Sequence, residues 1–268
     1  VWLKTTESSE DDKDRVLVKT SGEPTYFLPD IAYHFNKFVT RKFDRGINIL
    51  GADHHGYVAR LKAGVQAVGV DPARLDVIVM QMVRLVRGGE EVRMSKRKGE
   101  FVTLDELLNE VGVDAARFFF LMHAPNTHMD FDLDLAKERS MKNPVYYLQY
   151  AYVRCRSILQ NSKSQTLNPK QIQISKLKIL NTPSELTLMK QLVRMPDVVL
   201  QVAKDYQAQR LTTYALELAR SLHNFYESER VITDDKTITG ARLALVAAIA
   251  AVFEQVFGIL GISAPRKM

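Results

Sequence analysis

A short basic loop is the densest gathering of chemically active side chains in this chain. Between residues 87 and 99 it holds three glycines, one serine and five cations, which are Arg87, Arg93, Lys96, Arg97 and Lys98. Glycine lets the backbone approach a ligand closely, and clustered cations stabilise charge that develops on phosphate oxygens. The composition indicates a site for a triphosphate that loses pyrophosphate. A solvated basic turn is an equally good interpretation of the charge alone.

Residues 51–56, Gly-Ala-Asp-His-His-Gly, are a second candidate site. They follow a short apolar run and precede a helical pattern, so they lie where a parallel strand ends, and ligands bind at that edge of such sheets. Gly51 would let a nucleotide approach the backbone, and Asp53 could accept hydrogen bonds from ribose hydroxyls. His54 and His55 are adjacent and lack a spaced third ligand, so we expect no metal site. A strand-end turn with hydrogen-bonded histidines stays an alternative.

Tyr26 and Asp30 could together bind a guanidinium group. Such a group presents a fixed fork of donors and suits a carboxylate in a desolvated cleft. On the residues alone, the simpler interpretation is that Asp30 caps a helix and that Tyr26 is a half-buried strand aromatic.

Asp130, Asp132 and Asp134 alternate along the chain, as in a calcium-binding loop. The sixth position of that loop would be Leu135 instead of glycine, and the twelfth would be Met141 instead of an acid, which excludes an EF-hand. We expect these acids to end a helix or to support the basic loop.

The elements that position these residues are predicted from periodicity and from turn and cap signals. Strands alternate with helices before residue 136, which favours a parallel, doubly wound sheet; after it, helices prevail. The predicted strands are 15–19, 48–51 and 76–83, the last covered on both faces, with residues 26–28 extended. The predicted helices are 31–42, 57–68, 104–111, 115–122, 142–159, 184–206, 211–228 and 240–260. Thr103 and Glu106 suggest a capping box, Asp114 a helix cap, and Pro196 a kink or split.

Composition and charge narrow the function classes. The chain is 46% hydrophobic, as in globular proteins, and its single cysteine excludes an internal disulfide. The net charge of +6 is uneven: residues 1–138 carry 19 Lys and Arg against 22 Asp and Glu, whereas residues 139–268 carry 18 against 9. A basic C-terminal half is typical of a nucleic-acid partner.

Longer stretches resemble one family. Arg-Met-Ser-Lys-Arg, residues 93–97, resembles the KMSKS signature of class I aminoacyl-tRNA synthetases, and "GADHHGYVARLKA" and "NPVYYLQYAYVRCRSI" resemble arginyl-tRNA synthetases. The resemblance covers nearly the whole chain. It implies that residues 1–138 are the second half of a Rossmann-like, parallel-sheet catalytic domain. It also implies that residues 139–268 are an α-helical-bundle anticodon-binding domain of the DALR type.

The resemblance also implies roles for individual residues. Lys96, with Ser95 and Arg93, would act on the phosphates during catalysis, although Arg93 replaces a lysine of the signature. The adenylate site would comprise Gly51, Asp53, His54, Met82, Val83, Met94 and Lys96. Arginine would be bound by Tyr26, Asp30 and Asp53. The tRNA anticodon would be contacted by Tyr150, Arg154, Tyr226, Arg230 and Met268, with Arg156 as a further phosphate contact.

One element of the family is missing from the printed sequence, which contains no His-x-Gly-His motif. We therefore expect a C-terminal piece of an arginine–tRNA ligase that is inactive alone. The intact enzyme would use ATP, with Mg²⁺ as counter-ion, to activate arginine and charge tRNA(Arg), as a cytoplasmic monomer without a membrane. A non-catalytic RNA-binding module is the main alternative, and a nucleotidyltransferase of the same superfamily is another.

Overall fold

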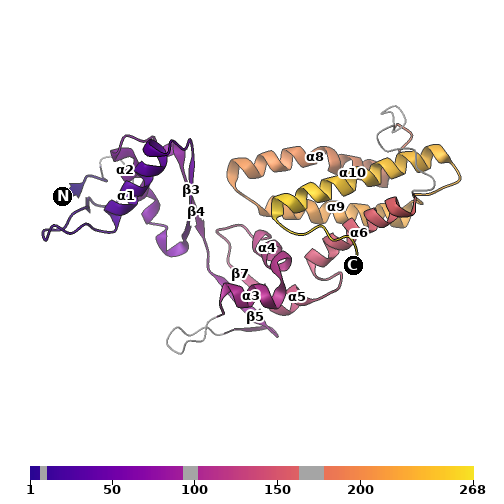
Figure 1. The fold of residues 1–268 in the computed structure, drawn as a ribbon, viewed down its shortest axis with the longest axis horizontal. Coiled ribbons are helices and arrows are strands. Elements are labelled where there is room, and N and C mark those ends of the chain that lie inside the picture. The colour runs from indigo at the N-terminus through magenta and orange to yellow at the C-terminus, as the bar shows by residue number, and fades with distance from the viewer. Residues whose placement is uncertain (7–10, 93–101, 163–177) are drawn as a thin grey trace. The chain divides into compact units, whose positions relative to one another are not determined.

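The computed structural model describes residues 1–6, 11–92, 102–162 and 178–268. Its contacts divide the chain into two compact units (Figure 1). Unit 1 comprises residues 1–83 and 125–129, and unit 2 comprises residues 84–124 and 130–268. The domain boundary expected after residue 138 stays a prediction, because units defined by contacts and domains defined by sequence are different divisions.

Unit 1 contains a two-stranded parallel sheet covered by helices. Strands β3 (Gly46–Gly51) and β4 (Leu75–Met80) pair in parallel, from Gly46 opposite Leu75 to Gly51 opposite Met80. A parallel pair needs a crossover, which consists of η2 (Ala52–His54), α2 (Tyr57–Ala67) and η3 (Pro72–Arg74). The remaining elements are β1 (Trp2–Leu3), which pairs antiparallel with β2 (Arg15–Val16), and α1 (Phe27–Phe35), which continues into the π-helical turn η1 (Asn36–Thr40). The core consists of Phe38, Leu61, Val65, Val70 and Leu75.

Two predictions for unit 1 are wrong in their bounds. Residues 26–28 are not extended, because α1 already begins at Phe27. Pro29 lies in its first turn, where a missing N–H loses no helical hydrogen bond. The strand predicted over 76–83 ends at Met80, where the next N–H, of Gln81, donates to the Pro125 carbonyl at 2.7 Å. β4 is also only partly buried instead of covered on both faces.

Unit 2 begins with a small mixed layer. A three-stranded sheet has the order β6-β5-β7, with β5 (Val83–Arg87), β6 (Glu90–Glu91) and β7 (Met129–Asp132). The accompanying helices are α3 (Leu104–Val111), α4 (Val113–Leu121) and α5 (Leu133–Lys137). The Thr103–Glu106 capping box of α3 is confirmed.

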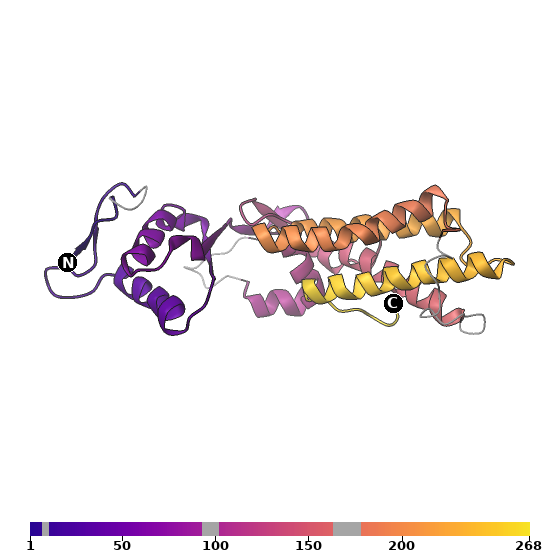
Figure 2. The same ribbon diagram turned by 90° about the horizontal axis from the view of Figure 1, so that it is seen from above.

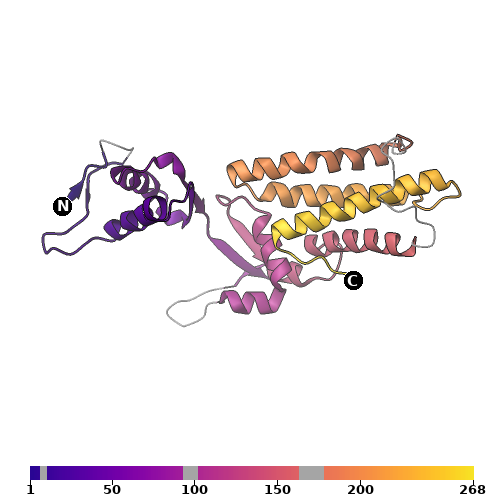
Figure 3. The ribbon, with the colours of Figure 1, turned by 45° about the horizontal axis from the view of Figure 1, so that its top comes forward.

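Four long helices make up most of the rest of the described part of unit 2 and lie side by side in Figures 2 and 3. They are α6 (Pro144–Asn161), α8 (Pro183–Asp205), α9 (Gln209–Ser228) and α10 (Lys236–Leu260). One apolar face of α9 lies in the bundle core, with Tyr214, Leu218, Leu222 and Phe225 fully buried. α8 runs unbroken through Pro196, so it is not split there.

Among the described helices, α10 is the one long and apolar enough to cross a membrane by length and composition alone, with a mean hydropathy of 2.2 over its most apolar window. Half of that window is buried inside the structure. The core helix of a helical bundle has the same composition.

Asp114 does not cap α4, contrary to the prediction. Gly112, with φ of +82°, is the cap, and Asp114 lies in the first turn. Its carboxylate instead accepts hydrogen bonds from the Ser263 N–H at 2.9 Å and from Gln149 Nε2 at 2.8 Å. Arg117 Nε, on the same helix, donates to the Leu260 carbonyl at 3.0 Å. α4 therefore anchors the chain that leaves α10.

Candidate functional site

Unit 1 contains a pocket of about 590 Å³ between its strand ends and helices. Its lining includes Tyr26, Asp30, Leu50, His54, Tyr57 and Arg60. The two residues predicted to bind arginine, Tyr26 and Asp30, thus share one pocket with the predicted adenylate residue His54. Of the side chains that line it in the described part of the chain, only Asp30 is a carboxylate.

Asp30 is held in place by a tyrosine that the sequence analysis missed. It lies in the first turn of α1, and its Oδ2 accepts a hydrogen bond from the Tyr57 hydroxyl of α2. The Tyr57 ring meets Phe27 edge to face at 5.9 Å. Burial raises the pKa of Tyr57 well above its usual value, and the hydrogen bond to Asp30 raises it further. The phenol therefore stays a donor that orients the carboxylate.

Tyr26 is placed differently from either interpretation of the sequence. It is the cap residue of α1 and is 96% exposed, so it is neither a half-buried strand residue nor a desolvated partner for a guanidinium. Its predicted role in binding arginine requires closure of the pocket over the ligand and stays a prediction.

The arginines beside the pocket have an acid of their own. Asp11 pairs with Arg15 and lies 3.5 Å from Arg60 Nε. The hydrogen bond from Arg15 is the main cause that holds the pKa of Asp11 far below its usual range, against the opposing effect of burial. Because Asp11 neutralises these cations, Asp30 remains the acid that a cationic ligand in the pocket would meet.

The predicted adenylate residues lie at the carboxyl ends of the parallel strands. Gly51 ends β3, and a Cβ added there would lie 2.7 Å from Asp53 Oδ1, so only glycine lets this carboxylate fold back over the strand end. Asp53 Oδ1 also lies 2.9 Å from His54 Nδ1. Beyond β4, Met82 is 74% exposed and Val83 is half-buried. These residues therefore lie at an exposed edge of the sheet that a nucleotide could reach. Their roles in binding a nucleotide stay predictions.

The residues of the basic loop predicted to be catalytic, Arg93, Ser95 and Lys96, lie outside the described residues, as does Met94 of the predicted adenylate site. The turn that leads to them is described. Gly88 N–H donates to Asp134 Oδ2 at 2.8 Å, and Asp132 caps α5. The predicted position of these acids at a helix terminus is confirmed by Asp132. Their support of the basic loop stays a prediction.

Arg87, counted among the loop cations, is held by an acid. Its Nη2 lies 2.7 and 2.8 Å from the two carboxylate oxygens of Glu110, which also binds Lys137 at 2.8 Å. The hydrogen bond from Lys137 is the main cause of a lowered pKa of Glu110. Arg87 therefore braces the base of the loop.

Three of the predicted anticodon residues meet in unit 2. The Arg154 guanidinium of α6 lies 4.1 Å over the Tyr226 ring of α9 and donates to the Tyr150 hydroxyl at 3.2 Å. His223 stacks on Tyr150 with ring centroids 6.0 Å apart. We call Tyr150, Arg154, His223 and Tyr226 the aromatic cluster. Flat rings and a guanidinium are the groups on which unpaired bases stack.

His223 and its neighbour Tyr147 were missed in the sequence. Tyr147 lies 4.9 Å from the His223 ring. Burial lowers the pKa of His223, and the charge of Arg154 lowers it further. The spacing of 147, 150 and 154 on one helix and of 223 and 226 on another places each set on one face. Only the packing of α6 on α9 shows that the two faces meet.

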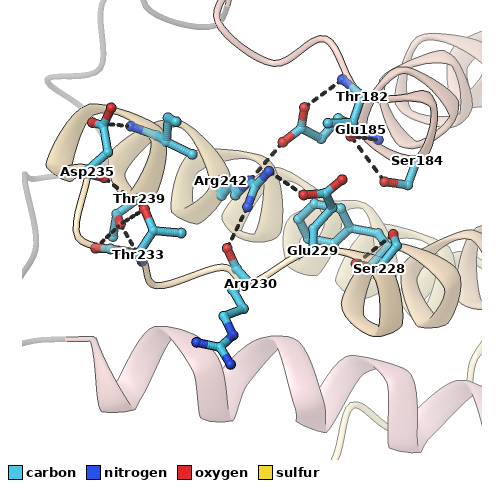
Figure 4. A network of polar contacts seen from close by, with 12 residues as sticks. Thr182, Ser184, Glu185, Ser228, Glu229, Arg230, Thr233, Asp235, Thr239 and Arg242 are labelled. Carbon is cyan, nitrogen blue, oxygen red and sulfur yellow. Dashed lines mark hydrogen bonds and ion pairs between the residues drawn. The ribbon is translucent and has the colours of Figure 1, made fainter.

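The other predicted tRNA contacts are separate from this cluster. Met268 lines a different pocket, of about 910 Å³, with Asp114 and Gln149. Arg156 lies 3.4 Å from Glu254 of α10, so an intramolecular acid already neutralises it. The backbone carbonyl of Arg230 accepts from Arg242 at 2.6 Å, while its side chain points away from that network (Figure 4).

Two family models match different parts of the chain. A model of the class I (R) tRNA synthetase catalytic domain matches residues 4–130, and a model of the DALR anticodon-binding domain matches residues 148–268. The arginine–tRNA ligase of Moorella thermoacetica is 51% identical over all 268 residues, which cover 48% of that protein.

Two solved structures have the same fold. A putative arginyl-tRNA synthetase from Campylobacter jejuni matches with a TM-score of 0.86 and 32% identity, over 100% of this chain and 57% of that one. The arginyl-tRNA synthetase of Thermus thermophilus matches with a TM-score of 0.83 and 21% identity, over 100% of this chain and 53% of that one. The expected fold class is confirmed. The chain spans about half the length of the curated relatives it matches.

Proposed function

Because this chain belongs to the arginyl-tRNA synthetase family, we propose that it is part of an arginine–tRNA ligase. The whole enzyme joins arginine to ATP, releasing pyrophosphate, and passes arginine from the adenylate to the terminal ribose of tRNA(Arg). Unit 1 supplies part of the arginine and adenylate site, and the helices of unit 2 bind the tRNA. In this proposal the enzyme acts as a cytoplasmic monomer without a membrane.

One observation carries the tRNA-binding part of the proposal. Arg154 lies over Tyr226 and reaches Tyr150, so residues from two helices form a cationic and aromatic surface. Stacking of a base on an aromatic side chain is worth about 1–3 kcal/mol. The cluster lies in the half of the chain that carries the positive charge, which would attract RNA phosphates.

The arginine-binding part depends on Asp30. Its carboxylate is oriented by Tyr57 in a pocket where the other acid nearby, Asp11, is engaged by arginines. A guanidinium entering the pocket could donate paired hydrogen bonds to this carboxylate. Asp53, at the end of β3, would then bind the ribose, and Lys96 would neutralise the phosphates as the arginine carboxylate attacks.

Magnesium enters this proposal only with ATP. Within the described ranges, no three His, Cys, Asp or Glu side chains gather into a metal site. Mg²⁺ would accompany the ATP phosphates as their counter-ion.

Binding of tRNA to the 268-residue chain tests the proposal. We expect tRNA(Arg) to bind more tightly than a noncognate tRNA across a salt series, and Arg154→Ala to weaken cognate binding about tenfold or more, because stacking is lost. Arg156→Ala is the matched control: it removes the same charge from α6 at a residue paired with Glu254. Equal affinity for both tRNAs would show that only charge attracts RNA to this chain, and it would refute the proposal.

We also propose that these 268 residues alone do not activate arginine. Their sequence contains no His-x-Gly-His element to complete the ATP site. Formation of AMP that depends on arginine and tRNA, by the purified chain, would overturn this part. Restoration of that activity in a longer chain with such an element would support it.

A further inference from the structure

A buried arginine connects three segments at one end of the helical bundle. Arg242 of α10 is 8% exposed. Its Nε donates to Glu185 Oε1 of α8 at 2.8 Å, and its Nη2 lies 2.5 Å from Glu229 Oε2 at the end of α9 (Figure 4). Its third donor, Nη1, lies 2.6 Å from the backbone carbonyl of Arg230.

The two carboxylates account for the buried charge. A buried guanidinium needs partners for its donors and its charge, and Glu185 and Glu229 supply both. Glu185 also accepts the Thr182 N–H at 3.0 Å in the capping box of α8. These contacts tie the start of α8 to the end of α9, as an apolar contact of similar size could also do.

The hydrogen bond from Arg242 to the Arg230 carbonyl has a consequence for the chain that follows α9. α9 ends at Ser228, and the cap residue Glu229 has φ of −129° and ψ of 134°, so the chain leaves the helix extended. A segment with no helical hydrogen bonds is fixed only by its own contacts. Among the described contacts of Arg230, the hydrogen bond from Arg242 to its carbonyl is the one to a side chain of another element.

The Arg230 side chain projects on the opposite side from this contact. It is exposed, and in Figure 4 its guanidinium points away from Arg242. Arg230 also follows Tyr226 of the aromatic cluster by four residues. Holding the backbone from the buried side would keep the guanidinium available for an RNA phosphate or base.

We propose that Arg242 is a positioning residue for tRNA binding, which fixes the backbone at Arg230 and so presents the Arg230 guanidinium. This inference rests on the proposed tRNA-binding function. A planar guanidinium fork can hold two carboxylates and a carbonyl in three fixed directions, and a lysine ammonium cannot reproduce that geometry. Loss of the fork would leave Arg230 to be ordered only when RNA binds.

A double-mutant cycle on the 268-residue chain tests the proposal, with tRNA(Arg) affinity and thermal unfolding measured for each variant. We expect Arg230→Ala to weaken binding about tenfold and Arg242→Lys about fivefold, the range expected for ordering one long side chain on binding. In the double variant, Arg242→Lys should weaken binding no further, while its effect on the melting temperature should be the same with or without Arg230.

Thr239→Val is the matched control for loop stability. Thr239 hydroxyl binds the Thr233 N–H at 2.9 Å and so fastens the same loop without contacting Arg230. This variant should lower the melting temperature and leave tRNA affinity unchanged. If Arg242→Lys does not fold, Glu229→Gln replaces it, with a smaller effect in the same direction that is likewise absent without Arg230.

The outcomes separate this inference from the function on which it rests. If the double variant lost tRNA affinity by the product of the two single losses, Arg242 would act independently of Arg230. That result would overturn the inference. Selective binding of tRNA(Arg) that Arg230→Ala leaves unchanged would also overturn it while the proposed function stands. Equal binding of cognate and noncognate tRNA by the unmodified chain would refute the function itself.

Discussion

The parallel sheet of unit 1 and the helical bundle of unit 2 bury their apolar residues to different extents. On β3, Ile47 and Ile49 are 47% and 64% exposed. On α9, the stripe that includes Tyr214 and Phe225 has no exposed surface. Consecutive helices joined by short connections cover one another, whereas a parallel sheet needs helices on both faces that come from distant segments. The helices of the bundle therefore bury one another's apolar faces, whereas the sheet leaves the face that carries Ile47 and Ile49 exposed.

The same difference extends to the two candidate sites. The aromatic cluster consists of side chains that contact one another across two packed helices, with Arg154 placed over Tyr226. At the proposed adenylate edge, Asp53 and Met82 are exposed. A site on packed elements is preorganised, so the proposed RNA-binding surface would be closer to its working geometry in this chain than the proposed adenylate edge.

The test with the largest expected effect compares two substitutions that each shorten an apolar side chain to alanine. Phe225→Ala should lower the free energy of unfolding of the bundle by about 3–5 kcal/mol, because it leaves a cavity in a closed core. Ile49→Ala, on the exposed face of β3, should change stability by less than about 0.5 kcal/mol. Denaturant unfolding followed by far-UV circular dichroism measures both. Equal losses from the two variants would contradict the difference in burial.

A second test uses the ion pair inside the bundle. Burial raises the pKa of Glu185, but the Thr182 N–H and the Arg242 guanidinium outweigh burial, so its folded pKa lies below the usual 4.5. The ionised group therefore contributes stability above pH 4.5, and that stability is lost as the pH falls through the folded pKa. Glu185→Gln should destabilise the bundle by about 2 kcal/mol at pH 7.

The pH dependence of Glu185→Gln sharpens the comparison further. The gap between the variant and the unmodified chain should be constant above pH 5 and should narrow below pH 4.5. Thermal unfolding between pH 3 and pH 7 measures it. A gap that stays the same down to pH 3 would show that folding does not lower the pKa of this carboxyl group.

The smallest test compares two glycines at the end of α10. Gly261 has φ of +67°, and a Cβ there would lie 2.6 Å from Arg117 Nε, so Gly261→Ala should cost about 1–2 kcal/mol or more. Gly258 lies inside the helix with no atom within 4 Å of an added Cβ. Gly258→Ala should therefore stabilise the bundle by about 0.5–1 kcal/mol. Thermal melts decide the two signs. Stabilisation by Gly261→Ala would contradict the left-handed backbone and the close contact with Arg117, and destabilisation by Gly258→Ala would contradict the open space there.

The sequence was most informative where the signals were local. The helices of the bundle, their buried faces and the Thr103 capping box follow from periodicity and cap chemistry within a few residues. It was least reliable at element ends near proline and at polar residues with distant partners. Residues 26–28 were predicted to be extended although α1 begins at Phe27. Asp114 was predicted to cap a helix, although its partner Ser263 is 149 residues away.

The candidate sites divide in the same way. Residue types and spacing singled out the basic loop and the Gly51–Asp53 turn as candidate sites. The role of Tyr26 and Asp30 in binding arginine came from the family resemblance. The partners that make those residues usable, Tyr57 for Asp30 and His223 for the aromatic cluster, come from other elements. No pattern within one segment predicts them.

The sequence by itself determined the family, the order of a parallel-sheet part and a helical part, and the basic charge of the helical part. Each of these depends on the identity and spacing of residues near one another in the chain. Only the tertiary structure decided that Arg154 lies over Tyr226 and that Arg242 holds the Arg230 carbonyl. Such contacts depend on how helices pack, and side-chain direction across an interface is fixed by that packing, not by local propensity.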